Sequence, residues 1–424
     1  MKLRTIVASM ALISPVIQVQ AAVSDADFAA LQEQLAAIAT RLNTLESENA
    51  ELKAANAETI KEVVFTREQV ENMTPENAAI SRTGSGLKVA SIDGDKSFAI
   101  GGRLQWDYAN IDINGENVVN DTYIRRGRIY LKGQSDDWAY KTQLNLDNNR
   151  GGLFRRGGTV EDFYVTYKGF GSTANITAGK HNAPFSLERL TSSNDMTALE
   201  RSASTNFFIF DRQVGIQFHG KSGMFTYGVG AYEAEAALFD SGDPIEDLGS
   251  QDLAIIGRLT AAPINNDGNV LHFGAGFVHT TEESKRFGLK DVYNIEAAAV
   301  LGAFHVQTEY FNGQLATEGS SEVDTYYLQA GWVITGESRP YKDGKFKRIK
   351  PTGDYGAWEV LARYNDGDGD YEGLGDREAK SYLVGINWYA NNRVRIGANY
   401  AMIEEDVTGQ DADIFQTRLQ YVFD

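Results

Sequence analysis

Apolar and polar side chains alternate along most of the chain from residue 97 onward. The stretch "FAIGGRLQWDY", residues 98–108, carries mostly bulky apolar groups at even positions and small or polar groups at odd positions. Successive side chains of a β-strand point to opposite faces, so a period of two predicts strands with one apolar and one polar face. The same period recurs in "WAYKTQLNLD", "FHVQTEYF", "YLQAGWVI" and "FQTRLQYVF".

Sixteen strands are predicted from this alternation. They lie near residues 97–109, 123–132, 138–147, 161–168, 173–180, 212–219, 224–232, 253–261, 270–279, 292–300, 303–311, 325–335, 357–364, 380–389, 393–402 and 414–423. Short turns follow the even-numbered strands and longer loops the odd-numbered ones, except for a long connection over residues 336–356. An even strand number with this asymmetry predicts an all-β transmembrane barrel of 16 antiparallel strands over residues 97–424.

A soluble β-sandwich would alternate in the same way, so the period alone does not decide between lipid and water. Strands of about ten residues match the length of a tilted membrane strand. Aromatic side chains also recur near strand ends on the apolar face, as membrane barrels require at the interfaces. Together with an export signal, these features favour the membrane barrel.

The first 22 residues predict a secretory signal peptide. Lys2 and Arg4 precede an apolar run over residues 6–17, and small residues follow at 21 and 22. The run is shorter than the roughly 20 apolar residues of a membrane helix, and the alternative is a buried N-terminal helix. The chain contains no cysteine, which suits an oxidising compartment. Export and a barrel together predict the bacterial outer membrane.

Residues 23–73 predict a periplasmic coiled-coil helix. Apolar side chains recur at spacings of three and four from Phe28 to Leu52, among good helix formers. Such a narrow stripe favours a coiled coil, and Asn49 and Asn56 at core positions would fix its strand number. The alternative is a single helix lying on the rest of the protein. Residues 74–96 lack periodicity and are interpreted as a linker.

Charge is distributed unevenly between the faces of the predicted strands. The chain has a formal net charge of -18. A cation at the bilayer midplane on the lipid side costs roughly 2–4 kcal/mol, so basic residues within strands are assigned to the lumen. In "RRGRIYLKG", Ile129 and Leu131 then face lipid, while Arg125 has outward parity near a strand end. The lumen candidates are Arg103, Arg126, Arg128, Lys132, Lys141, Arg258, Arg363, Arg395 and Arg418, and Lys168 also has inward parity.

A cationic wall in a narrow pore would favour anions. Alternatively, these arginines pair with lumen carboxylates and brace the wall. The insertion His181–Arg212 is long and polar enough to fold inward as a constriction. The charged residues expected there are Arg189, Glu200, Arg201 and Arg212. The alternative for this insertion is an outer lid without a role in selectivity.

Several stretches resemble the phosphate- and polyphosphate-selective porins of Gram-negative outer membranes, porins O and P. They include "RRGRIYLKG", "AGKHNAPFSLERLTSSNDMTALERS", "DRQVGIQFHG", "WVITGESRPY", "GAWEVLARYND" and "GINWYANNRVRIGANYA". The resemblance implies a sixteen-stranded barrel that assembles as a homotrimer, with the loop after strand five narrowing each pore and basic residues guiding anions. It implies that Arg126 and Arg128 belong to the basic lumen set, and that Glu200 and Arg201 lie in the constriction.

The function expected is passive diffusion of small hydrophilic solutes, favouring anions such as phosphate. The alternative is a general porin without marked anion selectivity, whose coiled coil serves the cell envelope. An enzyme is not expected, because G-x-S-x-G and H-E-x-x-H are absent and the five histidines have no metal-ligand spacing. No cofactor, metal or nucleic-acid partner is expected, and the expected contacts are outer-membrane lipid and copies of this chain.

Overall fold

The computed structural model divides the chain into two units, Met1–Glu76 and Asn77–Asp424. The structure describes residues 41, 44, 47, 48, 50, 78–81, 86–91, 95–146, 159–208, 210–233, 253–266, 268–280, 289–315, 321–371, 375–405, 409 and 411–423.

In the first unit, the described residues are helical and exposed. They are Arg41, Thr44, Ser47, Glu48 and Ala50. The predicted signal peptide and the apolar positions of the predicted coiled coil lie outside the described residues. Within the part of the chain that is described, no helix is long and apolar enough to cross a bilayer.

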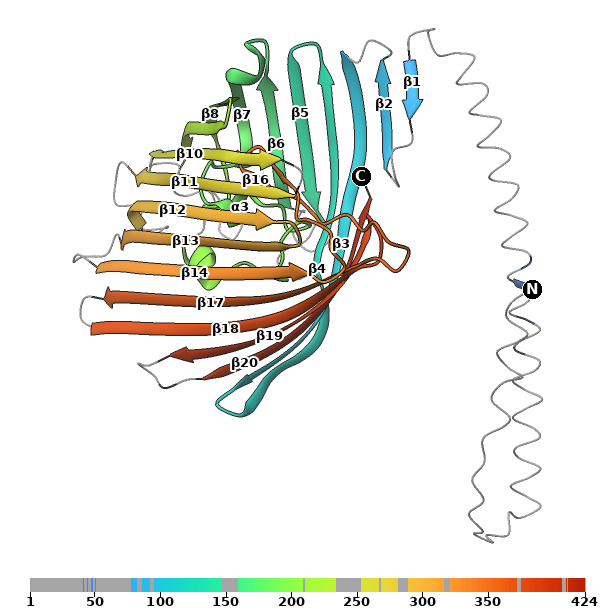
Figure 1. Ribbon diagram of the computed structural model, residues 1–424. Helices are drawn as coiled ribbons and strands as arrows, with labels where there is room; N and C mark the ends of the chain where they lie inside the picture. The colour runs from blue at the N-terminus through green and yellow to red at the C-terminus, as the bar shows by residue number, and fades with distance from the viewer. Residues whose placement is uncertain are drawn as a thin grey trace, which may run out of the picture. The chain divides into compact units, whose positions relative to one another are not determined.

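The second unit is a closed antiparallel barrel of sixteen strands (Figure 1). The strands are β3 (Lys96–Ile113), β4 (Glu116–Ser135), β5 (Trp138–Asn145), β6 (Thr159–Tyr167), β7 (Asn175–Asn182), β8 (Arg212–Ser222), β9 (Phe225–Glu233), β10 (Leu253–Asn266), β11 (Asn269–Thr280), β12 (Leu289–Leu301), β13 (Phe304–Leu315), β14 (Ser321–Val333), β17 (Ala357–Tyr371), β18 (Gly375–Tyr389), β19 (Val394–Glu405) and β20 (Ala412–Phe423). The barrel closes where β20 pairs with β3, from Ala412 opposite Ile113 to Phe423 opposite Gly102. The predicted fold class and strand number are confirmed for this unit.

Several strands are longer than the alternation predicts, among them β3, β4, β17 and β18. β3 and β4 continue into a hairpin whose turn residues Asn114 and Gly115 have φ values of 52° and 80°. Positive φ at both central residues is the geometry of the tight hairpin turn that Asn-Gly favours. The sequence prediction stopped at residue 109 and resumed at 123, so it missed this hairpin.

The outer surface of the barrel is apolar and carries aromatic side chains near both ends of the strands. Ile129 and Leu131 are 40% and 39% exposed, which confirms their outward assignment. Beside the short turns, Phe304 stacks on Trp332 and Trp358 stacks on Trp388, with ring centroids 5.3 and 5.7 Å apart. At the other end lies a row of outward tyrosines that includes Tyr326, Tyr364 and Tyr382. Two aromatic bands flanking an apolar zone are typical of a barrel that spans a membrane.

Strands β1 (Ala78–Ser81) and β2 (Leu87–Ser91) lie within the segment interpreted as a linker. β2 pairs with β3 from Leu87 opposite Ile100 to Ala90 opposite Ser97, and β1 pairs with β2. The expectation that residues 74–96 lack regular structure is therefore wrong for these strands. Both strands are held by pairing, β2 with β3 and β1 with β2, and a four- or five-residue strand has too few positions to show a period.

The interior of the barrel is occupied by two segments that enter from opposite ends. The inner loop, residues 183–211 between β7 and β8, contains α3 (Leu187–Leu190) and α4 (Ala203–Phe207). Its Phe185 and Phe208 pack with Phe311 of the wall in the largest buried apolar cluster. Figure 1 shows this green segment within the ring of strands.

The second segment is the long connection on the short-turn side. It forms the inner hairpin, β15 (Tyr341–Lys342) and β16 (Lys345–Phe346). Phe346 is fully buried and belongs to one apolar cluster with Leu187 of α3. The connection departs from the short-turn rule because it is not a surface turn but a plug that packs into the lumen.

Candidate pore constriction

The inner loop lies against inward-facing side chains around much of the barrel. Gln105 of β3 donates to the Ser193 carbonyl oxygen (3.0 Å), and Asn387 of β18 donates to the Thr197 carbonyl oxygen (2.8 Å). On another side, Ser204 of α4 and Thr325 of β14 share a hydrogen bond of 2.7 Å. These contacts place the insertion inside the barrel, as predicted, and they exclude an outer lid.

Three buried arginines of the wall hold the backbone of the inner loop. Arg395 donates to the carbonyl oxygens of Met196 and Thr197, both at 2.5 Å. Arg418 donates to the Leu199 carbonyl oxygen (2.5 Å), and Arg363 to that of Glu200 (2.9 Å). All three arginines are at most 7% exposed. Their guanidinium groups therefore shape the loop and face little water.

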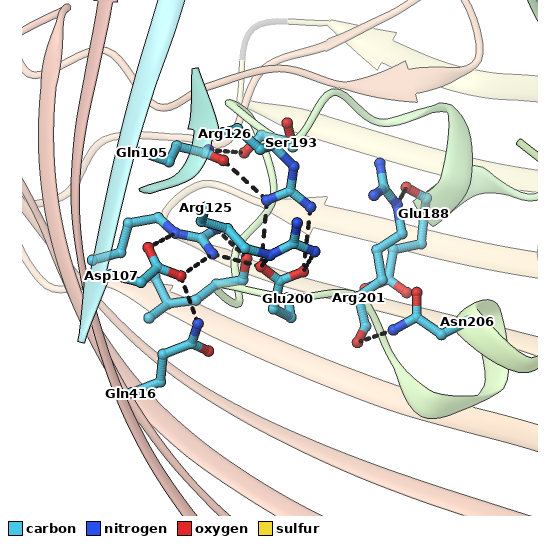
Figure 2. Close-up of polar contacts among 12 residues, drawn as sticks. Gln105, Asp107, Arg125, Arg126, Glu188, Ser193, Glu200, Arg201, Asn206 and Gln416 are labelled. Atoms are coloured by element: carbon cyan, nitrogen blue, oxygen red, sulfur yellow. Dashed lines mark hydrogen bonds and ion pairs between the residues drawn. The ribbon is translucent and has the colours of Figure 1, made fainter. Parts of the chain in front are cut away.

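Glu200 lies at the centre of an arginine cluster, which Figure 2 shows. Arg125 binds its carboxylate at both oxygens (2.9 and 3.0 Å), and Arg126 and Arg418 approach to 3.3 and 2.5 Å. Burial alone would raise the pKa of Glu200, but the three guanidinium groups hold that pKa well below its usual range. The carboxylate thus neutralises part of a strongly basic region.

A β-bulge explains why both arginines of the "RR" pair point inward. Gln105 pairs with Arg126 and the next residue, Trp106, pairs with Ile124, so Arg125 is the extra residue in β4. A bulge leaves one residue unpaired and re-aims its side chain. The outward parity assigned to Arg125 is wrong because parity counting assumes an uninterrupted ladder.

A second bulge lies in β6. Gln143 pairs with Asp162 and Leu144 with Val160, which leaves Glu161 as the extra residue and turns two adjacent carboxylates inward. Their ion pairs are Arg128–Glu161 (2.5 Å), Arg212–Glu161 (2.9 Å), Arg212–Asp162 (2.6 Å) and Lys141–Asp162 (2.5 Å). The proposed bracing of the wall by lumen acids therefore applies to Arg128, Lys141 and Arg212.

The remaining predicted basic residues divide between the loop and the wall. Arg201 donates to the carbonyl oxygens of Glu188, Arg189 and Thr191 within its own loop, and Arg189 pairs with Asp211. Arg103 donates to Ser193 (2.5 Å), which ties β3 to the loop. Arg258 pairs with Glu296 (2.5 Å) and donates to the Gly344 carbonyl oxygen of the inner hairpin (2.8 Å).

A cavity of about 1140 Å³ opens toward the short-turn side of the lumen. Its lining holds seven basic side chains and two carboxylates: Lys88, Lys132, Lys141, Lys168, Lys221, Arg258 and Lys345, with Asp162 and Asp343. The ammonium groups of Lys132 and Lys141 lie 5.0 and 5.8 Å from the ring centre of Tyr130, within cation–π range. Three of the predicted lumen candidates line this cavity, namely Lys132, Lys141 and Arg258, and six of its seven basic side chains are lysines.

Parity reasoning identified Lys132, Lys141, Lys168 and Arg258 but missed three lysines of this cavity. Lys88 lies in β2 and Lys345 in the inner hairpin, both outside the predicted strands, and Lys221 lies beyond the predicted end of its strand. The unusual length of the 336–356 connection was the signal that could have drawn attention to Lys345. Among the described residues, no group of His, Asp or Glu side chains is arranged to hold a metal ion.

A sixteen-stranded barrel with a lipid-facing surface and a polar loop folded into its lumen defines a porin, a diffusion channel of the outer membrane rather than an enzyme. The chain belongs to the family of phosphate-selective porins O and P, whose family model matches residues 98–291 and 283–423. It is 31% identical over 414 residues to Porin O of Pseudomonas aeruginosa, covering 81% of this chain and 92% of that protein.

Other known proteins are similar to this chain either in sequence or in fold alone. An uncharacterised protein of Caulobacter vibrioides is 26% identical over 354 residues, covering 73% of this chain and 69% of that protein. The anion-selective porin of Comamonas acidovorans superimposes with a TM-score of 0.53 at 15% identity, covering 77% of this chain and 100% of that one. OprB of Pseudomonas putida gives a TM-score of 0.53 at 10% identity, covering 77% and 94%.

Proposed function

We propose that this porin passes small hydrophilic solutes by passive diffusion and favours anions, phosphate among them. One observation carries the proposal: the lumen cavity is lined by seven basic groups against two carboxylates, although the whole chain is acidic. Charge of one sign on the walls of a narrow, low-dielectric passage raises the local concentration of the opposite ion. The family is named for phosphate selectivity, and that name agrees with a basic cavity.

The lysines supply this preference more directly than the constriction arginines. The charge of Arg126 and Arg418 is balanced by Glu200, and that of Arg128 and Arg212 by Glu161. By contrast, Lys132 is exposed and Lys168 has only a side-chain amide as its partner in the described part of the chain. A phosphate ion entering the cavity can therefore bind ammonium groups without first displacing a carboxylate.

The test is the reversal potential of the purified porin in planar bilayers under a potassium chloride gradient. Anion selectivity is expected for the wild type, and Lys132→Gln with Lys168→Gln should reduce it. A matched control, Lys96→Gln with Lys350→Gln, removes two exposed lysines that do not line the cavity. Cation selectivity of the wild type, or equal effects of the two double variants, would contradict the proposal.

A general porin with little anion preference is the second candidate. The ion pairs of Glu161 and Asp162 with Arg128, Arg212 and Lys141 favour it, because they neutralise positive charge inside the lumen. Added phosphate distinguishes the two candidates in the same bilayers. An anion site is expected to show a reduction of chloride current at low phosphate concentration, whereas a general porin would show none.

We also infer a homotrimer, an N-terminal signal peptide over residues 1–22 and a periplasmic coiled coil over residues 23–73. The heptad spacing from Phe28 to Leu52 supports an oligomer held by helices.

N-terminal sequencing of the exported protein tests the signal peptide, with Val23 as the expected first residue. Deletion of residues 23–76 should weaken the oligomer on native gels while leaving the barrel folded, and unchanged mobility of the oligomer would argue against a clamping role.

A further inference from the structure

Glu309 of β13 is a fully buried carboxylate with an unusual set of partners. It accepts five hydrogen bonds, from Ser186 Oγ (3.1 Å), Leu187 N (2.9 Å), Glu188 N (2.8 Å), Asn294 Nδ2 (3.2 Å) and Tyr327 Oη (2.8 Å). Three of these donors belong to the first residues of the inner loop around α3. The other two belong to the adjacent wall strands β12 and β14.

Most lumen carboxylates of this barrel have a cationic partner, but within the described residues Glu309 has none. Asp107 pairs with Arg418, Glu161 with Arg128, and Glu296 with Arg258. Glu309 also lies directly opposite Glu296 in the β12–β13 ladder, where like charges disfavour each other. A buried carboxyl in such a place is costly unless hydrogen bonds compensate it. Here the compensating donors come mainly from the loop rather than from a basic side chain.

The loop backbone at this point needs external support. Ser186, which immediately precedes α3, has φ 63° and ψ 135°, a conformation that a residue with a side chain rarely adopts. Its hydroxyl donates to Glu309 and accepts from the Arg189 amide (3.1 Å). Residues held in sparsely populated conformations persist only where surrounding contacts over-determine them. Glu309 supplies several of those contacts at once.

Further contacts connect the start of the inner loop to its later residues. The Glu188 carboxylate, one residue into α3, accepts from the Ser202 amide (2.9 Å) and faces Arg363 (3.4 Å). Arg201 donates back to the Glu188 carbonyl oxygen (3.2 Å). The start of the loop is thereby joined to the segment that carries Glu200, whose carboxylate lies in the arginine cluster.

We propose that Glu309 is the positioning residue of the pore constriction: it holds the backbone amides at the start of the inner loop and thereby fixes where Glu200 lies among the arginines of the wall. Glu309 itself is not a ligand of the solute. The role rests on the proposed function in one respect, namely that the inner loop narrows the path taken by solutes.

The test compares Glu309→Gln with Glu296→Gln in purified protein. The two glutamates are cross-strand neighbours and equally buried, but the contacts of Glu296 with Arg258 and His272 do not reach the inner loop. In Glu309→Gln the amide group turns a donor toward the loop amides, so these hydrogen bonds cannot all form. We expect a several-fold rise in open-channel current noise and trypsin cleavage after Arg189 or Arg201. Glu296→Gln removes the partner of Arg258, which contacts the inner hairpin, but it should leave trypsin cleavage of the inner loop at the wild-type level.

If Glu309 only stabilised the barrel, Glu309→Gln would change thermal unfolding rather than current noise and protease cleavage of the inner loop. The thermal unfolding temperature of the barrel, followed by gel mobility, should be lowered no more by Glu309→Gln than by Glu296→Gln, which breaks a buried ion pair. Glu309→Asp should recover part of the low current noise because it retains a carboxyl group. Wild-type noise and protease resistance in Glu309→Gln would overturn the proposal. If that variant does not fold, Ser186→Ala decides: a smaller rise in noise and cleavage is expected, and wild-type behaviour would overturn it.

The same bilayers separate this proposal from the proposed function. A wild-type reversal potential that shows cation selectivity would remove the anion preference without affecting the comparison between Glu309→Gln and Glu296→Gln.

Discussion

Arginine and lysine have separate places in this lumen. Arg395 and Arg418 use the planar guanidinium to bind two loop carbonyl oxygens or a carboxylate and a carbonyl oxygen at once. Such forked donation suits arginine, whereas the ammonium group of lysine is compact and strongly hydrated. Lysines therefore remain along the water-accessible cavity while arginines are buried against the inner loop. The residue types, and not only their charge, indicate which cations are available to a solute.

Lys345 gives a prediction on pH. Burial is the main cause that lowers the pKa of this lysine to about 8, and the nearby charges of Lys347 and Arg258 add to it. The ammonium form therefore dominates below about pH 8 and is lost as the pH rises through that value. We expect anion selectivity to fall over this interval, measured as reversal potential against pH.

Lys345→Gln is the matched variant, because it lacks the titrating group at every pH. Its selectivity should start lower than that of the wild type and show a smaller step near pH 8. A step of wild-type size in this variant would assign the titration to another group.

At the level of elements, segments that interrupt the regular ladder build the interior. The bulges at Arg125 and Glu161 each turn one additional charged side chain inward. The inner hairpin brings Lys345 to the cavity on the short-turn side of the lumen. The regular strands provide the wall, and these irregular elements determine its electrostatic pattern.

Phe346 anchors the inner hairpin and provides a second prediction. It is fully buried with Leu187, Val270 and Val300, and the Arg339 guanidinium lies 4.0 Å from its ring centre. Truncating a buried phenylalanine to alanine costs about 3–5 kcal/mol in typical cores. Phe346→Ala should therefore loosen the hairpin and raise single-channel conductance and current noise in planar bilayers.

The control for that variant comes from the same connection. Tyr355 is 89% exposed, so Tyr355→Ala removes an aromatic ring of similar size without disturbing the packed hairpin. Equal conductance changes in the two variants would show that the effect does not come from packing inside the lumen.

On the scale of the whole barrel, closure depends on one pair of strands that are far apart in the chain. β20 pairs with β3 along twelve positions, and Phe423 lies opposite Gly102. The Phe423 ring covers the glycine, an arrangement in which an aromatic side chain compensates for a missing one. The acidic surplus of the chain does not prevent a basic cavity, whose lining holds seven basic side chains and two carboxylates.

Gly102→Val tests closure. A β-carbon at this position would lie 2.4 Å from the Arg128 carbonyl oxygen and 2.4 Å from Phe423 Cζ, and the backbone oxygen cannot rotate away. Overpacking of this kind costs about 1–3 kcal/mol, and more where backbone must move. The barrel of the variant should lose its compact gel mobility at a lower temperature than the wild type.

Gly353→Val is the corresponding control, because nothing lies within 4 Å of a β-carbon built there. An unfolding temperature for Gly102→Val equal to that of the control would mean that the seam tolerates the added side chain.

Much of the wall could be predicted because the signal is local. Alternation in "RRGRIYLKG" assigns Ile129 and Leu131 to the outside and Arg126 and Arg128 to the inside, and the structure agrees. The inward course of the inner loop also follows from its length and polarity. By contrast, the partners of Arg395 lie about two hundred residues away in the chain, and no spacing in the sequence relates them.

The sequence by itself determined the number of strands and the lipid-facing side of their regular parts, because both follow from the period of two in neighbouring residues and the cost of charge in lipid. The tertiary structure alone decided which cations are neutralised and which face water. The Glu200 cluster and the loop donors on Glu309 join residues distant in the chain, and the two bulges depend on the register between neighbouring strands. A local pattern specifies neither loop packing nor register shifts.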